Sequence, residues 1–136
     1  MTSGEHDPYG AVGDWMTKEP LSVEPECSIS DALARMSQAA VRHLLVMETG
    51  CLVGIVSYRD WRRARAHSVS PAWEREPISR IMTEEPVTVD AETSVRLAAR
   101  MLLERKIGCL PVRAGNRIVG IFTTSDALEA LLSALG

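Results

Sequence analysis

The sequence contains one seven-residue pattern twice, as GIVSYRD at residues 54–60 and GIFTTSD at residues 120–126. Each copy consists of Gly, two apolar residues, a hydroxyl residue, two variable residues and Asp. The pattern predicts the end of a strand followed by a capping box, in which the hydroxyl and the Asp start a helix. The same hydroxyl and carboxylate, beside free N–H groups at a helix N-terminus, also suit the phosphate and ribose of a nucleotide. The pattern alone leaves both interpretations open.

The two copies belong to a longer duplication. Residues 16–64 align with residues 82–130 without a gap, so that MTKEPLSV falls on MTEEPVTV and each VGI falls on the other. Chance does not explain an ungapped register that also keeps the apolar pattern. The sequence therefore indicates a tandem repeat.

Each repeat predicts the element order β-α-β-β-α. A short extended piece (21–23 or 86–89) precedes a helix that starts at Ser28 or Ser30, or at Thr93 or Ser94. Ile29, Leu33, Met36 and Ala40 are spaced to form the buried face of the first helix. Two strands joined by a Gly-containing turn follow, as 43–47 with 52–56 and as 109–113 with 118–122. The last helix of each repeat runs from Asp60 onward or from Asp126 to Leu135.

These elements predict an α+β fold with four segments. They are a flexible N-terminal tail (1–13), a first repeat (14–65), a connector (66–78) and a second repeat (79–136). A repeat of about 50 residues buries only a marginal core, so we expect the repeats to pack on each other. Trp61 and Trp73 flank the connector and are expected to attach it to the body, as Trp15 is expected to do before the first repeat.

The composition argues against several classes of protein. A net charge of -3 argues against a nucleic-acid binder. No apolar run approaches the ~20 residues that cross a bilayer, and the start MTSGEHDPYG has no signal-peptide character. Cys27, Cys51 and Cys109 are far apart and fit reduced thiols, so we expect a cytoplasmic protein without a metal site. No catalytic spacing is found, and we therefore expect no enzyme.

The repeated motifs resemble a pair of cystathionine-beta-synthase (CBS) domains, a so-called Bateman module. The resemblance rests on DWMTKEPLSV, SRIMTEEPVTV, CLPV and the two Gly-to-Asp stretches, and it covers about residues 14–133. It implies two β-α-β-β-α repeats packed about a pseudo-two-fold axis, with two clefts between them. It also implies a regulatory module that requires no cofactor and binds AMP, ADP or ATP in those clefts.

The resemblance further implies roles for individual residues. Asp60 and Asp126 would accept hydrogen bonds from ribose, and Ser57 and Thr123 would contact phosphate. The wall around the adenine would include Thr88, Gly108 and Pro111 in the second repeat. In the first repeat Ser22, Arg42 and His43 are further candidates, and Arg59 would neutralise phosphate, although Leu45 replaces Pro111 there. We expect the Asp126 side to be better equipped for the base and ribose.

Several alternatives remain open at this point. Arg59, Arg62, Arg63 and Arg65 with His67 would form either a polyphosphate clamp or a solvated helix face balanced by Glu74 and Glu76. Broad apolar helix faces favour a homodimer, whose output would pass to an unidentified effector protein. The rival interpretation is a structural dimerisation or scaffold module with non-functional nucleotide sites. A weaker rival is nucleic-acid binding by the arginine helix.

Overall fold

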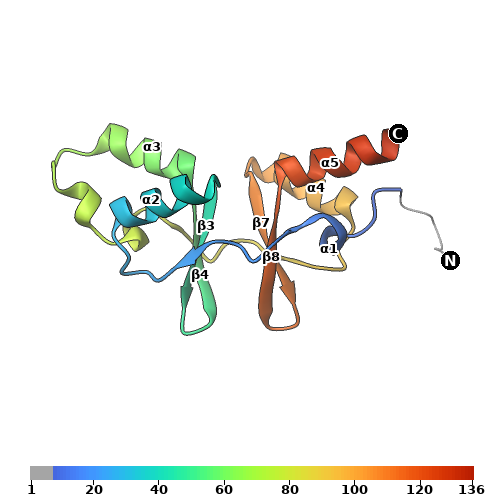
Figure 1. Ribbon diagram of the computed structural model, residues 1–136, viewed down its shortest axis with the longest axis horizontal. Helices are drawn as coiled ribbons and strands as arrows, with labels where there is room; N and C mark the ends of the chain where they lie inside the picture. Colours follow the sequence, from blue (N-terminus) through green and yellow to red (C-terminus); the bar gives the residue numbers. More distant parts are fainter. Residues whose placement is uncertain (1–7) are drawn as a thin grey trace. The chain divides into compact units, whose positions relative to one another are not determined.

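The computed structural model describes residues 8–136, which fold into two compact units (Figure 1). We call residues 20–86 the central unit, and the described residues up to Glu19 together with residues 87–136 the C-terminal unit. Each unit contains a four-stranded sheet and α-helices, which confirms the predicted α+β class.

The central unit contains a mixed sheet with the strand order β2-β3-β4-β5. Its elements are β2 (Ser22–Val23), α2 (Ile29–Ala39), β3 (His43–Glu48), β4 (Cys51–Ser57), α3 (Tyr58–His67), the 3-10 turns η1 (Trp73–Arg75) and η2 (Ile78–Arg80), and β5 (Thr83–Glu84). Strands β3 and β4 form the predicted hairpin. Thr49 and Gly50 both have positive φ at its turn, as a tight hairpin of this kind requires.

The C-terminal unit has the equivalent sheet, with the order β1-β8-β7-β6. Its elements are α1 (Val12–Trp15), β1 (Thr17–Lys18), β6 (Val89–Asp90), α4 (Val95–Arg105), β7 (Cys109–Ala114), β8 (Arg117–Thr123) and α5 (Thr124–Leu135). Strands β7 and β8 form the second predicted hairpin. The β-α-β-β-α order of each repeat is therefore present, with additional short strands.

In each unit, helices cover one face of the sheet. Ser28 caps α2 and Ser94 caps α4, each with its hydroxyl accepting a backbone N–H at 3.1 Å. The buried residues of α2 are Ile29, Ala32 and Met36, whereas Leu33 is only half-buried and Ala40, which ends the helix, is exposed. The prediction of Leu33 as a core residue is thus wrong by one position, because the helix faces the sheet with its i, i+3, i+7 positions.

The two Met-Thr segments form strands that the sequence did not predict. Strand β1 pairs antiparallel with β8, placing Thr17 opposite Ile121. Strand β5 pairs antiparallel with β4, placing Thr83 opposite Ile55. One edge strand of each sheet, β1 or β5, therefore comes from the segment that begins the other sequence repeat. The compact units are therefore divided differently from the two sequence repeats.

Part of the predicted N-terminal tail packs on the C-terminal unit. Val12 is fully buried in the core of that unit, and its N–H donates to the Thr93 carbonyl at 2.8 Å. The N–H of Gly13 donates to the Ala91 carbonyl, also at 2.8 Å. Residues 8–13 thus differ from the flexible tail expected for them, and residues 1–7 lie outside the described part of the chain.

The tryptophans attach the connecting segments to the cores as expected. Trp61 and Trp73 both pack against the core of the central unit, with ring centroids 6.4 Å apart. Trp15 packs against the core of the C-terminal unit and donates from Nε1 to the Tyr9 carbonyl at 2.9 Å. Ile78, the last residue of the predicted connector, is itself buried in the central core.

Candidate functional site

Both repeated motifs form complete capping boxes. In the central unit, the N–H of Ser57 donates to Asp60 Oδ2 at 2.8 Å, and the N–H of Asp60 donates to Ser57 Oγ at 3.0 Å. In the C-terminal unit, Thr123 N–H donates to Asp126 Oδ2 at 2.9 Å and Asp126 N–H to Thr123 Oγ1 at 3.2 Å. The structural interpretation of the two motifs is therefore confirmed.

Capping leaves part of each carboxylate available. A carboxylate has about four lone-pair sites on its two oxygens, and the cap uses one oxygen. Asp60 is half-buried and lines an open pocket. Asp126 is only 6% exposed, and Thr17 Oγ1 lies 3.5 and 3.4 Å from its two oxygens. Capping and ligand binding are thus compatible at Asp60, whereas Asp126 is the more enclosed of the two.

Two further predicted residues of the central unit, Ser22 and Ser57, lie on the sheet face opposite the helices, whereas Arg59 is exposed on α3. Register places Ser57 opposite His43 and Ser22 opposite Leu45. Side chains alternate between the faces of a strand. Because Leu44 and Val46 belong to the helix-covered core, these four residues share the other face. The sheet therefore brings Ser22 and Ser57 to one face, two strands apart.

The C-terminal unit repeats this arrangement with different side chains. Thr123 pairs with Cys109, and Pro111, which is buried, pairs with Ile121. Thr88 is half-buried and directly precedes β6. The Gly108 carbonyl accepts the Thr124 N–H at 3.2 Å. The predicted residues of the second repeat thus cluster within one unit, separately from those of the first.

His43 and Cys109 occupy equivalent positions and give the two sites different electrostatics. Burial lowers the pKa of His43, Asp60 raises it, and Arg42 and Arg59 lower it. These contributions place His43 among one acidic and two basic groups. Burial, with a contribution from Asp126, raises the pKa of the Cys109 thiol to about 12. His43 is therefore influenced by charged groups of both signs, whereas the charged group that acts on Cys109 is Asp126.

The repeated glycines within the strands are explained by close backbone contacts. A Cβ on Gly120 would lie 2.6 Å from the Thr17 carbonyl oxygen. A Cβ on Gly54 would collide with the Met82 side chain and lie 3.1 Å from the Thr83 carbonyl oxygen. The two glycines thus admit strands β1 and β5. They give no support to a closely approaching ligand.

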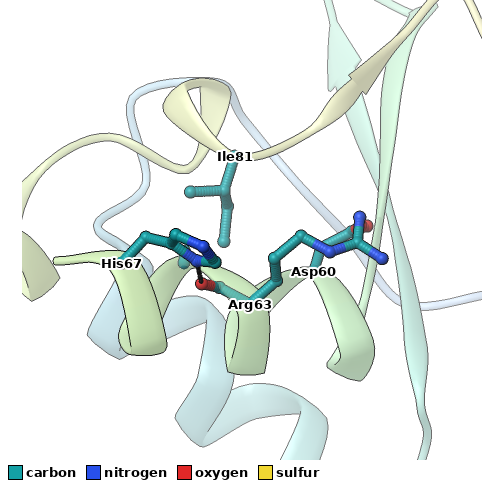
Figure 2. Close-up of a pocket in the computed structure, with 5 residues that line it drawn as sticks. Asp60, Arg63, His67 and Ile81 are labelled. Atoms are coloured by element: carbon teal, nitrogen blue, oxygen red, sulfur yellow. Dashed lines mark hydrogen bonds between the residues drawn. The ribbon is translucent and has the colours of Figure 1, made fainter.

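The arginine-rich helix α3 lines the pocket to which Asp60 belongs. This pocket has a volume of about 360 Å³ and is lined by Asp60, Arg63, Ala64, His67 and Ile81 (Figure 2). Arg65 lies over the Trp61 ring at 5.5 Å instead of facing the pocket. We expected Glu74 and Glu76 to balance the arginines of α3. Among residues 8–136 no such ion pair is found, and Glu76 instead pairs with Arg80 at 3.9 Å.

Exposed leucines are concentrated on the helices of the C-terminal unit. Leu128, Leu131, Leu132 and Leu135 of α5 are exposed, as are Leu97 and Leu103 of α4. The exposed side chains of α3, by contrast, are mainly arginines. The expectation of broad apolar faces on the helices of both repeats therefore holds for α4 and α5 and is wrong for α3.

Two tandem α+β repeats, each ending in a capped strand-to-helix turn, define the class of this protein. The family model described as "CBS domain" matches residues 12–67 and 78–133. The chain therefore belongs to the CBS-domain family and carries two copies of the domain, which confirms the resemblance seen in the motifs.

Solved structures of CBS proteins have the same fold. The crystal structure of CBSX2 in complex with AMP has a TM-score of 0.80 and 30% identity, covering 93% of this chain and 99% of that one. CBSX2 is a chloroplastic protein of Arabidopsis thaliana. The CBS domain pair of protein MJ0100, in complex with 5′-methylthioadenosine and S-adenosyl-L-methionine, has a TM-score of 0.80 and 26% identity, covering 93% and 98%.

Some relatives are much longer than this chain. Homoserine O-acetyltransferase of Methanococcoides burtonii is 33% identical over 120 residues, which are 87% of this chain and 23% of the enzyme. The chain thus spans less than a quarter of that relative. Among the helices of residues 8–136, none has the length and hydropathy needed to cross a membrane.

Proposed function

We propose that this chain is a regulatory module that binds adenine nucleotides of the AMP, ADP or ATP type and has no chemistry of its own. Asp60 and Asp126 accept the ribose hydroxyls, and Ser57 and Thr123 contact phosphate. Ser22 and Arg59 complete the site of the central unit. Thr88, Gly108 and Pro111 provide the adenine wall of the C-terminal unit.

One observation carries this proposal. Asp60 uses Oδ2 for its cap and is still accessible from an open pocket, so it retains acceptor capacity for a ligand hydroxyl. Arg59 is exposed in the first turn of the same helix, where a phosphate would also be favoured by the helix N-terminus. The AMP complex of CBSX2 and the adenosine-type ligands of MJ0100 support the choice of ligand class.

Binding would act through linkage. A ligand that binds one conformation better than another shifts the population toward it, and that conformation would contact an effector protein differently. A homodimer formed through the exposed leucines of α5 is part of the proposal, because residues at i, i+3, i+4 and i+7 form one continuous stripe. So is a cytoplasmic location, which suits the three free cysteines.

The alternative is a structural dimerisation or scaffold module whose nucleotide sites do not function. It is favoured by the capping boxes, since both carboxylates turn back onto their own helices. It is favoured further by the burial of Asp126, because the remaining hydrogen-bond acceptor capacity of this carboxylate faces the Thr17 hydroxyl. Under this alternative the leucine stripe alone would provide the function.

A thermal-shift experiment separates the two. The protein is heated with AMP, ADP, ATP, NAD or S-adenosylmethionine, as wild type and as Asp60→Asn and Asp126→Asn. Ligand at about 100 times its Kd adds about 2.7 kcal/mol to the free energy of unfolding, which raises Tm by several degrees. We expect a shift with an adenine nucleotide that one of the variants abolishes. Each Asn keeps an oxygen for the cap, so the unliganded Tm controls for folding. No shift at millimolar ligand would favour the scaffold alternative.

A further inference from the structure

The pocket on α3 places an arginine and a histidine along the helix from the Asp60 carboxylate. Arg63 and His67 line it together with Asp60, while Ala64 and Ile81 provide apolar contacts. Within residues 8–136, neither Arg63 nor His67 forms an ion pair. Figure 2 shows the Arg63 side chain extended toward the Asp60 end of the pocket.

The polar residues that line the pocket are spread along the axis of α3. Asp60, Arg63 and His67 lie at i, i+3 and i+7 on α3 and so share one face of the helix. At a rise of 1.5 Å per residue, Arg63 lies about 4.5 Å and His67 about 10.5 Å beyond Asp60 along the axis. A ligand held at Asp60 would have to extend along the helix to meet both basic side chains.

His67 is oriented by its own helix. Its Nδ1 lies 2.9 Å from the Arg63 carbonyl oxygen, which can only accept, so Nδ1 is the donor (Figure 2). This leaves Nε2 for a ligand.

The equivalent face of the other repeat has the opposite charge. The shift of 66 positions that aligns the repeats places Glu129 where Arg63 stands and Ser133 where His67 stands. Both Glu129 and Ser133 are on α5 and exposed. A polyphosphate extending along α5 would meet a carboxylate, which repels it.

We propose that the α3 pocket binds the phosphate chain of a nucleoside di- or triphosphate whose ribose is held by Asp60. This rests on the proposed function and adds a selectivity to it. The central unit prefers ligands with more phosphates, through Arg63. The C-terminal unit has no such preference. The central unit therefore distinguishes adenine nucleotides by the number of their phosphates.

Calorimetric titration of the full chain with adenosine, AMP and ATP tests this. We expect wild type to bind ATP about five- to tenfold more tightly than AMP, as charge-assisted contacts of an arginine with phosphate would produce. Arg63→Gln should reduce that ratio below about twofold and leave the affinity for adenosine unchanged. Arg62→Gln, an exposed neighbour that does not line the pocket, is the matched control and should keep the wild-type ratio. An equal ratio in wild type and Arg63→Gln would overturn the proposal.

Titration with inorganic tripolyphosphate distinguishes a failure of the phosphate-pocket proposal from a failure of the proposed nucleotide-binding function. If no adenosine compound binds but tripolyphosphate does, in a manner that Arg63→Gln abolishes, the nucleotide function is overturned and the pocket stands as a polyphosphate site. If neither binds, both proposals are overturned. Arg63→Lys, which keeps the charge, should retain most of the tripolyphosphate affinity and so controls for loss of fold.

Discussion

The hydroxyl of Thr17 lies 3.4 and 3.5 Å from the two carboxylate oxygens of Asp126, across 109 residues of sequence. Thr17 reaches this position because β1 pairs with β8, which ends where the Thr123–Asp126 cap begins. The contact joins the first Met-Thr segment to the motif of the second repeat. The equivalent pair, Thr83 and Asp60, forms no such hydrogen bond in the described structure, and Asp60 is correspondingly more open.

Replacing Thr17 by Val should destabilise the protein by about 0.5–1 kcal/mol. The substitution removes a long hydrogen bond and leaves a buried carboxylate with one partner fewer. Urea unfolding measures the change. Thr83→Val is the matched control and should stay within about 0.3 kcal/mol of wild type, because Thr83 is equally exposed but forms no hydrogen bond with Asp60 in the described structure. Equal losses in the two variants would contradict a specific role for Thr17.

Gly120→Ala should destabilise by about 2–3 kcal/mol, since the new Cβ would be forced against backbone. It would meet the Thr17 carbonyl oxygen at 2.6 Å and the Met16 sulfur at 2.9 Å. Gly54→Ala should cost less, about 1 kcal/mol, because the atom it strikes first is the flexible Met82 sulfur. Unfolding of both variants in one denaturant series gives the comparison. A smaller loss for Gly120→Ala than for Gly54→Ala would refute this account of the strand contacts.

The Cys109 thiol should make stability fall as the solution becomes alkaline. Burial raises its pKa from an ordinary value of 9.0 to about 12. Between these values the thiol ionises in the unfolded chain and stays protonated in the folded one. Ionisation of this thiol therefore leaves the free energy of unfolding unchanged below pH 9 and lowers it above pH 9, by about 1.4 kcal/mol per pH unit.

Unfolding of wild type and Cys109→Ala at pH 8, 9 and 10 checks this slope. Between pH 8 and pH 10, the free energy of unfolding should fall by about 1.4 kcal/mol more in wild type than in Cys109→Ala. Alkylation gives a second readout, because Cys51 is exposed while Cys109 is buried. Cys51 should react first, and rapid labelling of Cys109 in the folded protein would contradict the raised pKa.

The leucine stripe of α5 should determine the oligomeric state. Leu128 and Leu132 are 53% and 66% exposed, so replacing both by Lys should leave the fold intact. Light scattering after size exclusion should show a dimer for wild type and a monomer for the double variant. Arg62→Gln on α3 is the control and should remain dimeric. A monomeric wild type would remove the dimer from the proposed function.

Ala40→Gly should stabilise the protein by about 0.5–1 kcal/mol. Ala40 ends α2 with a φ of 56°, in the left-handed region that Gly adopts without a Cβ clash. Its N–H hydrogen bonds to the helix are backbone contacts and survive the change. Thermal unfolding measures the gain. Ala39→Gly, one residue earlier and still helical, should instead lower Tm.

The sequence predicted those elements that local patterns encode. The spacing of Ser57 with Asp60 and of Thr123 with Asp126 is itself a capping box, and the hairpin strands alternate around Gly-containing turns. The buried face of α2 was missed by one residue, because Ala32 carries a weaker apolar signal than Leu33. Periodicity shows which side is buried only to within about one position.

The exchange of β1 and β5 could not be predicted, because the partner of a two-residue strand is set by tertiary pairing. Its trace in the sequence was Gly54 and Gly120, each placed inside a strand where another backbone approaches. The α3 pocket was equally hidden, since it requires Ile81 from the segment before β5 to lie against the helix. The candidate residues could be named from the sequence, but the difference in exposure between Asp60 and Asp126 could not.

The strand exchange also bears on how such a chain could have originated. Only Glu19, Pro20 and Leu21 connect β1 to β2, and Glu19 is in the left-handed conformation. If β1 joined the free edge of its own sheet, it would lie about 14 Å from β2, three strand spacings away. The four Cα–Cα steps from Lys18 to Ser22 reach this distance only when fully extended, and the left-handed Glu19 makes the connection shorter. An ancestral protein of one repeat would therefore have completed its sheet with a strand from a second molecule, as an intertwined dimer. Gene duplication and fusion would have turned that obligatory partnership into a single chain, which then left Arg63 and Glu129 free to diverge.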